Sequence, residues 1–277
     1  MQVDQALLSR VEAIARAAGN AIMEVYARGS TAVQRKADDS PLTEADLRAH
    51  RLIAEQLSSL GQSWPVLSEE ASDIPAQERH GWSRYWLVDP LDGTREFLSR
   101  NGEFTVNIAL IDEHRPVLGV VHVPARGESF AGLVGGGAWR VDQAGRMQPL
   151  QVRTNSAVPP RVAGSRSHRG DSLDAFLVAL GAHEFLSVGS SLKFCLLASG
   201  EADVYPRLGP TSEWDIAAGH ALLLAAGGCV LQLDGTAVEY NRRESLLSPQ
   251  FVAIAARDHD WLGLLRPADC KTPTSSL

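Results

Sequence analysis

The chain has 277 residues, of which 44% are hydrophobic and 21% are charged, a composition typical of globular proteins with a sizeable core. This length fits one large domain or two closely joined ones. The net charge of -7, from 33 acidic and 26 basic residues, argues against a broad face for a nucleic-acid polymer, whereas small anionic ligands stay open. No apolar run approaches the roughly 20 residues of a membrane span, so we expect no integral membrane segment.

The three cysteines, Cys195, Cys229 and Cys270, show no Cys-x-x-Cys spacing. We interpret them as thiols in a reducing compartment. The N-terminal stretch carries charges throughout and lacks the apolar segment of a signal peptide. These features predict a cytoplasmic protein. Peripheral association with the inner membrane and the oligomeric state are left open.

The first third of the chain predicts two helices and two strands. Apolar residues recur every three or four positions from Leu7 to Val25, and Gly29 ends this helix. Thr43 is the expected N-cap of a second helix, which Gly61 follows. The stretches "WPVLSEE" and "RYWLVDP" are then two apolar runs that each lead into acidic residues, as expected of strands that end at a site.

The texture changes in the middle of the chain. Residues 104–142 contain β-rich runs separated by Gly, Pro and charged residues, which predict an antiparallel meander. Residues 147–160 have the composition of a boundary. Beyond them, strand-like and helix-like runs alternate, which predicts an α/β layer.

This order of elements predicts a fold of the α/β (α+β) class in two parts. We place an N-terminal α+β subdomain, with the metal-binding acids and an antiparallel sheet, at residues 1–153. A C-terminal α/β subdomain at residues 154–267 would complete the active site. We expect the tail, residues 268–277, to be disordered.

Five acidic residues stand at the ends of the expected elements: Asp46, Glu69, Asp89, Asp92 and Asp215. Some have ordinary explanations. Asp46 completes a variant of a capping box with Thr43, Asp215 suits the dipole at a helix start, and Glu69 fits a solvated turn. Their joint occurrence favours a common site, because open α/β folds bind ligands at the ends of their strands.

The chemistry of clustered carboxylates indicates which ligand this site takes. Carboxylates held close together repel, and burying them is costly unless cations compensate their charge. Hard oxygen ligands select Mg²⁺ or Mn²⁺. Two such ions about 3.5–4 Å apart would activate a water and stabilise the leaving oxygen in phosphoryl transfer. The acids therefore predict a metal-dependent phosphatase.

The stretch "VDPLDGT" has a local geometry suited to this chemistry. Pro90 restricts Asp89 to extended conformations, and the Leu91 carbonyl offers one more oxygen ligand. If a helix begins near Thr94, the amides of Gly93 and Thr94 can bind a phosphate oxygen. The Thr94 hydroxyl is then placed to orient a water.

A competing hypothesis for the same stretch is a covalent aspartyl-phosphate. Phosphatases of the haloacid-dehalogenase type carry Asp-x-Asp-Gly-Thr after an apolar strand, and the first Asp attacks phosphorus. Here two residues separate Asp89 from Asp92. In an extended strand a spacing of two keeps side chains on one side, whereas a spacing of three does not. We therefore interpret Asp89 as a metal ligand.

Three strings, "GQSWPVLSEE", "WLVDPLDGT" and "EWDIAAGHALLLAAGG", resemble the inositol monophosphatase superfamily of Mg²⁺-dependent, Li⁺-sensitive phosphatases, over about residues 36–256. Three others, "DGTREFLSRNGEFTVNIALI", "GSRSH" and "GSSLKFCLLASGEADVYPRLGPTSEWD", resemble its 3'(2'),5'-bisphosphate nucleotidase branch. Arg95 stands where many relatives have Lys, a change that keeps the charge.

The resemblance implies a layered αβαβα sandwich with two or three Mg²⁺ per active site, for which Mn²⁺ can substitute. It implies that Asp89 bridges two metals and that Asp92 and Asp215 hold the second. Glu69 and the Leu91 carbonyl would join the first metal.

Three residues would help to position the attacking water. The resemblance implies that Thr94 and Glu69 orient it, and that Asp46 supports Thr94 near a third, weaker metal. The implied substrate is 3'-phosphoadenosine 5'-phosphate, a by-product of sulfate assimilation, with 3'-phosphoadenylyl sulfate as a related candidate. AMP and phosphate would be the products.

The substrate also needs binding groups. We expect the scissile phosphate to lie among Glu69, Leu91, Asp92, Gly93, Thr94 and Asp215. For the second phosphate the candidates are Ser165, Arg166 and Lys193, with Arg207 as a further one. The arginines of this loop could equally be solvent-exposed.

Two alternative functions stay open. The same fold could act on inositol monophosphate or on a sugar bisphosphate. A non-catalytic nucleotide-binding protein would be expected to lack a metal ligand or the water-orienting residue, and none is missing from this sequence.

Overall fold

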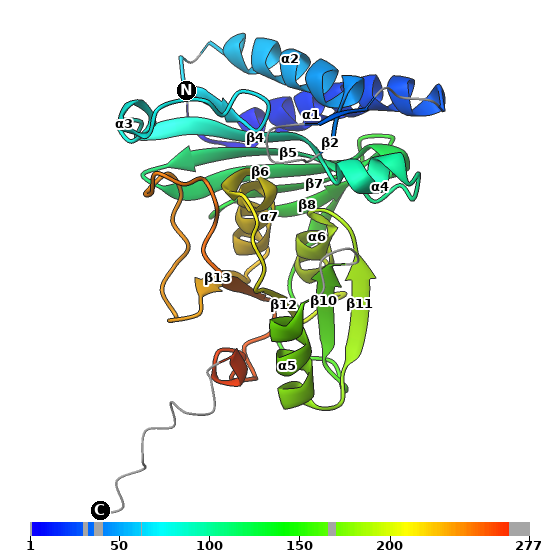
Figure 1. Ribbon diagram of the computed structural model, residues 1–277, viewed down its shortest axis with the longest axis vertical. Coiled ribbons are helices and arrows are strands. Elements are labelled where there is room, and N and C mark those ends of the chain that lie inside the picture. The colour runs from blue at the N-terminus through cyan, green and yellow to red at the C-terminus, as the bar shows by residue number, and fades with distance from the viewer. Residues whose placement is uncertain (1, 30–32, 36–40, 62, 166–169, 266–277) are drawn as a thin grey trace, which may run out of the picture.

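The computed structural model describes residues 2–29, 33–35, 41–61, 63–165 and 170–265. Arg166 and the tail from residue 268 lie outside the described residues. The elements stack in five layers, helix, sheet, helix, sheet and helix, as Figure 1 shows from top to bottom. The expected αβαβα sandwich is confirmed. None of the helices in the described part of the chain is long and apolar enough to cross a membrane.

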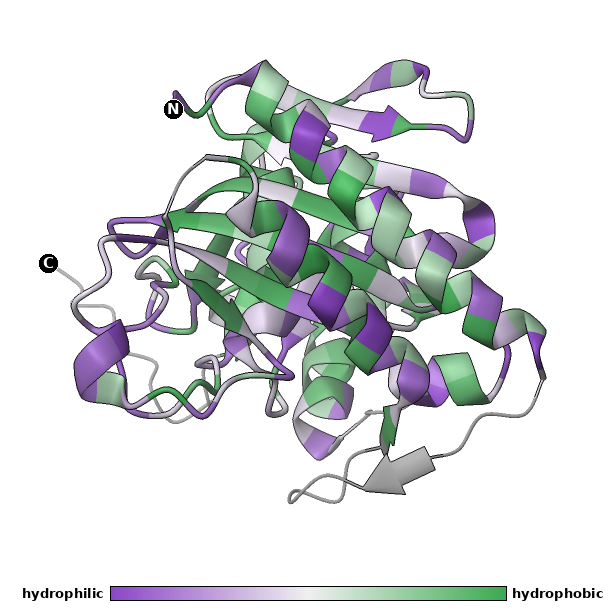
Figure 2. Cartoon of the chain, turned by 90° about the horizontal axis from the view of Figure 1, so that it is seen from above, coloured by the Kyte–Doolittle hydropathy of each residue, from purple (hydrophilic) through white to green (hydrophobic). Residues whose placement is uncertain are grey.

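The top layer consists of α1 (Gln5–Ala27) and α2 (Glu44–Ser58). Asp4 caps α1 by accepting a hydrogen bond from the Leu7 amide at 2.9 Å, and Thr43 caps α2 as expected. Seen from above in Figure 2, both helices cross a strongly hydrophobic sheet, and hydrophilic residues recur along them. Their apolar positions pack with the upper face of that sheet in one core cluster.

The upper sheet has seven strands in the order β3-β4-β5-β6-β7-β8-β9. Their bounds are β3 Val66–Ser68, β4 Arg84–Asp92, β5 Thr105–Asp112, β6 Arg115–Val123, β7 Glu128–Leu133, β8 Gly137–Val141 and β9 Met147–Leu150. β3 runs parallel to β4, and each later strand is antiparallel to its neighbour, so the expected meander is confirmed.

The last strand of the upper sheet differs from the expectation. Residues 147–150 were expected to belong to a boundary segment, but they form β9 at the edge of the sheet. Pro149 suggested a break, because proline lacks the amide that a central strand needs. An edge strand tolerates it, since only one of its sides is paired.

The lower sheet has five strands in the order β11-β10-β12-β14-β13. Their bounds are β10 Arg161–Ser165, β11 Glu184–Val188, β12 Val204–Arg207, β13 Cys229–Gln232 and β14 Phe251–Ile254. β10 is parallel to both neighbours, whereas β14 is antiparallel to β12 and β13. The helix α5 (Asp171–Leu180) covers its outer face.

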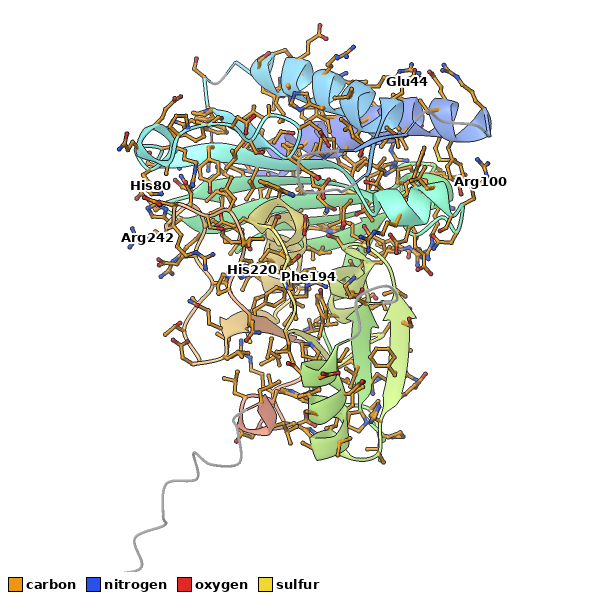
Figure 3. All side chains as sticks on the ribbon, in the orientation of Figure 1. Glu44, His80, Arg100, Phe194, His220 and Arg242 are labelled. Carbon is orange, nitrogen blue, oxygen red and sulfur yellow. The ribbon has the colours of Figure 1, made fainter. Side chains whose placement is uncertain are left out.

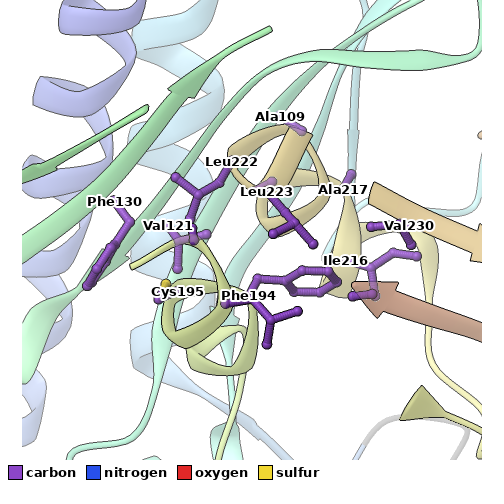
Figure 4. Close-up of a cluster of buried hydrophobic side chains, with 14 of the residues drawn as sticks. Ala109, Val121, Phe130, Phe194, Cys195, Ile216, Ala217, Leu222, Leu223 and Val230 are labelled. Carbon is purple, nitrogen blue, oxygen red and sulfur yellow. The ribbon is translucent and has the colours of Figure 1, made fainter. Parts of the chain in front are cut away.

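Between the sheets lie α6 (Leu192–Ala198) and α7 (Glu213–Ala225). Figure 4 shows their apolar side chains meeting residues of the upper sheet and Val230 of the lower one. A Cβ on Gly119 of β6 would lie 2.3 Å from the Ala218 carbonyl oxygen of α7. Glycine therefore allows α7 to approach the sheet closely, and it brings the start of α7 to the site.

The smaller elements were less accessible to sequence reasoning. They are β1 Val33–Arg35, β2 Pro41–Thr43, α3 Ala76–Arg79, α4 Thr94–Leu98, and the 3₁₀ turns η1 Pro124–Arg126 and η2 Gly263–Leu265. The start of α4 at Thr94 agrees with expectation. The others are too short to show a periodic pattern.

Candidate metal and phosphate site

The end of β4 carries a β-bulge between Asp89 and Asp92. Asp89 pairs with Asn107 of β5, and Asp92 pairs with Thr105, so three steps on β4 match two on β5. The extra residue is absorbed by the bulge, and the two acids take positions on the same face of the sheet. Spacing in an ideal strand had indicated opposite sides, so the bulge is what brings these acids together.

Gly93 follows with a left-handed backbone, at φ 88°, and acts as the N-cap of α4. The turn aims Thr94 back at the strand end. The Thr94 hydroxyl lies 3.4 Å from Asp46 Oδ1 and 3.4 Å from the Leu91 carbonyl oxygen. The Leu91 amide donates to Asp89 Oδ1 at 3.0 Å. The residues of "DPLDGT" therefore form one compact turn.

Asp46 is at once a helix cap and a neighbour of Thr94. Its Oδ2 accepts from the amide and the hydroxyl of Thr43, at 2.8 and 2.6 Å, which is the capping box expected from the sequence. Burial raises the pKa of Asp46 to about 6, against the lowering effect of the Thr43 hydrogen bonds. The two interpretations of Asp46 left open by the sequence are thus compatible.

Asp215 stands in the first turn of α7. Its Oδ2 accepts from the Thr211 hydroxyl at 2.7 Å and the Ser212 amide at 2.9 Å. Burial raises the pKa of Asp215 to about 7, and the charges of Asp92 and Glu69 add to the rise.

Asp89 is buried, with 1% of its surface exposed. Burial raises its pKa, and the negative charges of Glu69, Asp92 and Asp215 raise it further. The charges of these four carboxyl groups therefore interact with one another. Within the described ranges, however, no three His, Cys, Asp or Glu side chains are gathered closely enough to hold a metal ion as they stand.

A cavity of about 340 Å³ opens beside this acidic turn. Asp92, Gly93, Thr94 and Asp215 line it together with the cations Lys193 and Arg207. Lys193 is 5% exposed, and its Nζ donates to the Ser190 carbonyl at 2.5 Å. Burial lowers the pKa of Lys193 to about 8.

Two further candidates, Ser165 and Arg207, can be placed relative to this cavity. Ser165, at the end of β10, and Arg207, at the end of β12, both line it. Arg207 donates to the Pro210 carbonyl at 2.5 Å. Arg166 lies outside the described residues. The structure thus brings Ser165, Lys193 and Arg207 to one cavity with Asp92 and Asp215.

The site draws its residues from segments far apart in the chain, and a known protein family matches nearly the whole chain. A model of the inositol monophosphatase family matches residues 4–263. The chain belongs to the inositol monophosphatase family.

Curated relatives within this family are similar over most of their length. The chain is 52% identical to the 3'(2'),5'-bisphosphate nucleotidase CysQ of Salmonella typhimurium over 248 residues, which cover 88% of this chain and 98% of the relative. It is 51% identical to the 3'(2'),5'-bisphosphate nucleotidase CysQ of Escherichia coli over 247 residues, covering 88% of this chain and 98% of the relative.

Solved structures of the family share the fold. CysQ from Bacteroides thetaiotaomicron, a bacterial member of the family, aligns with a TM-score of 0.78 at 38% identity, covering 91% of this chain and 97% of that one. The extragenic suppressor protein suhB from Bartonella henselae aligns with a TM-score of 0.76 at 24% identity, covering 95% and 98%. The latter supports the fold alone.

Sequence reasoning missed the residues that hold the acids of this family member in place. Asp92 Oδ2 accepts from the hydroxyls of Ser190 at 2.7 Å and Ser191 at 3.1 Å, and Asn107 Nδ2 lies 3.4 Å away. Asn107 also donates to Ser191 at 2.9 Å. The available signal was weak: "FTVNIALI" places polar residues inside an otherwise apolar strand.

A second supporting group fixes the start of α7. Arg79 of α3 is 1% exposed and donates to Asn241 Oδ1 at 2.6 Å. The segment that follows Asn241 pairs with the residues before Asp215, because the Glu213 amide donates to the Leu246 carbonyl at 2.8 Å. Nothing in the local sequence around Arg79 indicated this role, because its partners lie about 160 positions away.

Proposed function

We propose that the chain is a Mg²⁺-dependent phosphatase that hydrolyses the 3'-phosphate of 3'-phosphoadenosine 5'-phosphate, giving AMP and phosphate. 3'-Phosphoadenylyl sulfate is a second candidate substrate with the same 3' group. The observation that carries the proposal is a cavity lined both by acids and by the buried cation Lys193. The 52% identity to a CysQ nucleotidase across 98% of that protein supports it.

The acids suit divalent cations. We assign Glu69, Asp89, Asp92 and Asp215, with the Leu91 carbonyl, to hold two or three Mg²⁺, for which Mn²⁺ can substitute. Burial raises the pKa values of Asp89 and Asp215, and repulsion by the neighbouring carboxylates raises them further; bound cations would relieve that repulsion. When bound, Mg²⁺ would supply Lewis acidity that polarises the phosphate and lowers the pKa of a water.

The chain's own groups would orient that water. The Thr94 hydroxyl can donate to Asp46 Oδ1, 3.4 Å away, and its oxygen then accepts a hydrogen bond from the water. We assign Glu69 to the water's other side. The water oxygen adds to phosphorus as the bond to the ribose 3'-oxygen breaks. The water gives up one proton, and the leaving ribose oxygen takes up one proton to become the 3'-hydroxyl of AMP.

The cations that line the cavity would hold the rest of the substrate. Gly93 and Thr94 border the position of the scissile phosphate, and Lys193, Ser165 and Arg207 face the same cavity. A second phosphate there would meet a buried ammonium group, where an anion is attracted more strongly than at the surface. We also assign Arg166 to this group on sequence grounds.

The test is phosphate release from 3'-phosphoadenosine 5'-phosphate. We expect a chelator to abolish turnover and Mg²⁺ to restore it. Asp89→Asn should lower kcat by more than about 100-fold, since changes to residues that only support metal ligands already cost 10- to 100-fold. The exposed Asp73→Asn is the matched control and should retain activity. Turnover that survives both the chelator and Asp89→Asn would refute the proposal.

The setting of this activity is also a proposal. The substrate is a small molecule rather than a nucleic-acid polymer. Within the described residues Cys195 and Cys229 are free thiols, which suits the reducing cytoplasm that we propose as its location.

A further inference from the structure

Ser190 contacts both an acid and a cation that line the cavity. It lies in the turn between β11 and α6, and its hydroxyl donates to Asp92 Oδ2 at 2.7 Å. Its backbone carbonyl accepts from Lys193 Nζ at 2.5 Å. A single residue therefore joins an acid that we assign to metal binding with the cation that we assign to the second phosphate.

The backbone of Ser190 is held in an unfavourable conformation. Its φ is 53°, in the left-handed region that residues other than glycine, asparagine and aspartate rarely adopt. Such a conformation persists only where the surroundings impose it. Here Asp92 and Lys193 are two of the groups that do so, and the Thr105 hydroxyl, 2.7 Å from the Ser190 hydroxyl, is a third.

Lys193 is well placed to respond to a ligand. It is 5% exposed, lines the cavity, and lies 5.4 Å above the centre of the Tyr205 ring. An anionic group that binds this ammonium would restrict it further. The Ser190 carbonyl, which shares the same ammonium, would then be restricted with it.

We propose that Ser190 is a positioning residue that couples divalent-cation binding at Asp92 to occupancy of Lys193 by the second phosphate. The inference rests on the proposed function, which assigns Asp92 and Lys193 their ligands. A ligand on either residue stabilises the turn, so the other ligand meets a lower ordering cost. Such coupling is reciprocal, and it makes Ser190 a determinant of preference for bisphosphates over monophosphates.

The test measures Mn²⁺ binding directly, from the electron paramagnetic resonance signal of the free ion. AMP is the probe, because it carries the second phosphate without the scissile one. In the wild type we expect saturating AMP to tighten Mn²⁺ binding about five-fold or more, the lower end of typical couplings. Ser190→Gly keeps a residue that accepts the left-handed backbone and removes the side chain that carries the hydroxyl. It should bind Mn²⁺ more weakly and show no response to AMP.

Ser199→Ala is the matched control. It removes a hydroxyl from the other end of α6, where Ser199 donates to the Cys195 carbonyl at 2.9 Å. It should respond to AMP as the wild type does. Should Ser190→Gly fail to fold, Thr105→Val tests the same coupling, since it is nearly isosteric and removes the hydroxyl bonded to Ser190. An equal response to AMP in these variants overturns the inference, because AMP would then act on the ion directly.

Turnover separates this inference from the function on which it rests. In the wild type, the Mg²⁺ concentration for half-maximal kcat/KM should be several-fold lower for 3'-phosphoadenosine 5'-phosphate than for 3'-AMP. In Ser190→Gly the two concentrations should agree. Absence of turnover of both nucleotides by the wild type refutes the function. Turnover with equal Mg²⁺ requirements and Mn²⁺ binding indifferent to AMP refutes only the coupling.

Discussion

Asp46 and Asp215 occupy the same position in their helices, the third residue after the N-cap. In each, one carboxylate oxygen accepts from the N-cap amide, at 2.8 and 2.9 Å, and from a threonine hydroxyl. These capping bonds fix the orientation of the carboxylate. Asp46 and Asp215 each stabilise a helix end and also belong to the site. For this reason, the sequence alone left both interpretations open.

His220 makes a residue-scale prediction about pH and stability. It is buried in α7, and its Nδ1 lies 2.9 Å from the Tyr240 hydroxyl. Burial lowers the pKa of His220 from 6.5 to about 3, so the unfolded chain binds a proton that the folded chain does not between these values. The contribution of neutral His220 to stability is complete above pH 6.5 and is lost as the pH falls. At pH 5 the loss amounts to about 2 kcal/mol.

The variant His220→Asn removes the titration and keeps a polar group near Nδ1. Its deficit in the free energy of unfolding at pH 7 should shrink by about 2 kcal/mol at pH 5, measured by urea denaturation at each pH. His80→Asn, at an exposed position on the outside of the molecule, is the control (Figure 3). A deficit that stays constant between pH 7 and pH 5 would show that His220 does not contribute in this way.

At the scale of elements, β4 shows which features could be predicted from the sequence and which could not. Its apolar run and terminal acids predicted a strand that ends at the site, and "DGT" predicted the helix start that follows. The bulge could not be predicted, because it depends on the register with β5. The same limit applies to Ser190 and Ser191, which reach Asp92 from almost 100 positions away.

Long elements were predictable for a related reason. Helices such as α1 and α7 carry an apolar pattern over many residues, so a local rule identifies them. Supporting contacts between distant segments leave no such local pattern. The acids of the site could therefore be nominated from the sequence, whereas the groups that orient them could not.

The contact between β6 and α7 gives a prediction at the scale of elements. A Cβ at Gly119 would lie 2.3 Å from the Ala218 carbonyl oxygen and 2.8 Å from the Ala221 side chain. We expect Gly119→Ala to push α7 away from the sheet and to cost about 1–3 kcal/mol of stability, as overpacking does. Activity should fall too, because α7 carries Asp215.

The control for this change is Gly81→Ala. Gly81 is exposed, and a Cβ there would meet the Glu78 carbonyl oxygen at an ordinary 3.4 Å. Thermal and urea unfolding of both variants check the stability, and phosphate release checks the activity. If Gly119→Ala unfolds like the wild type, the close approach of α7 does not set the spacing of these layers.

At the scale of the whole molecule, the site lies where the two sheets and the helices between them meet. Asp89 and Asp92 come from the upper sheet, Asp215 from α7, and Ser165 and Arg207 from the lower sheet. One hydrophobic cluster joins both sheets to α6 and α7. We therefore propose that the division near residue 153 separates two sheets that share a core and complete one site together.

The central claim is that this site acts on a bisphosphate nucleotide. The most direct test compares kcat/KM for 3'-phosphoadenosine 5'-phosphate, inositol 1-phosphate and fructose 1,6-bisphosphate under one Mg²⁺ concentration. We expect a preference of at least about 100-fold for the nucleotide, about 2.7 kcal/mol in transition-state binding. A Lys193→Met variant should lose much of that preference. Equal or better turnover of the inositol or sugar phosphate by the wild type would contradict the account.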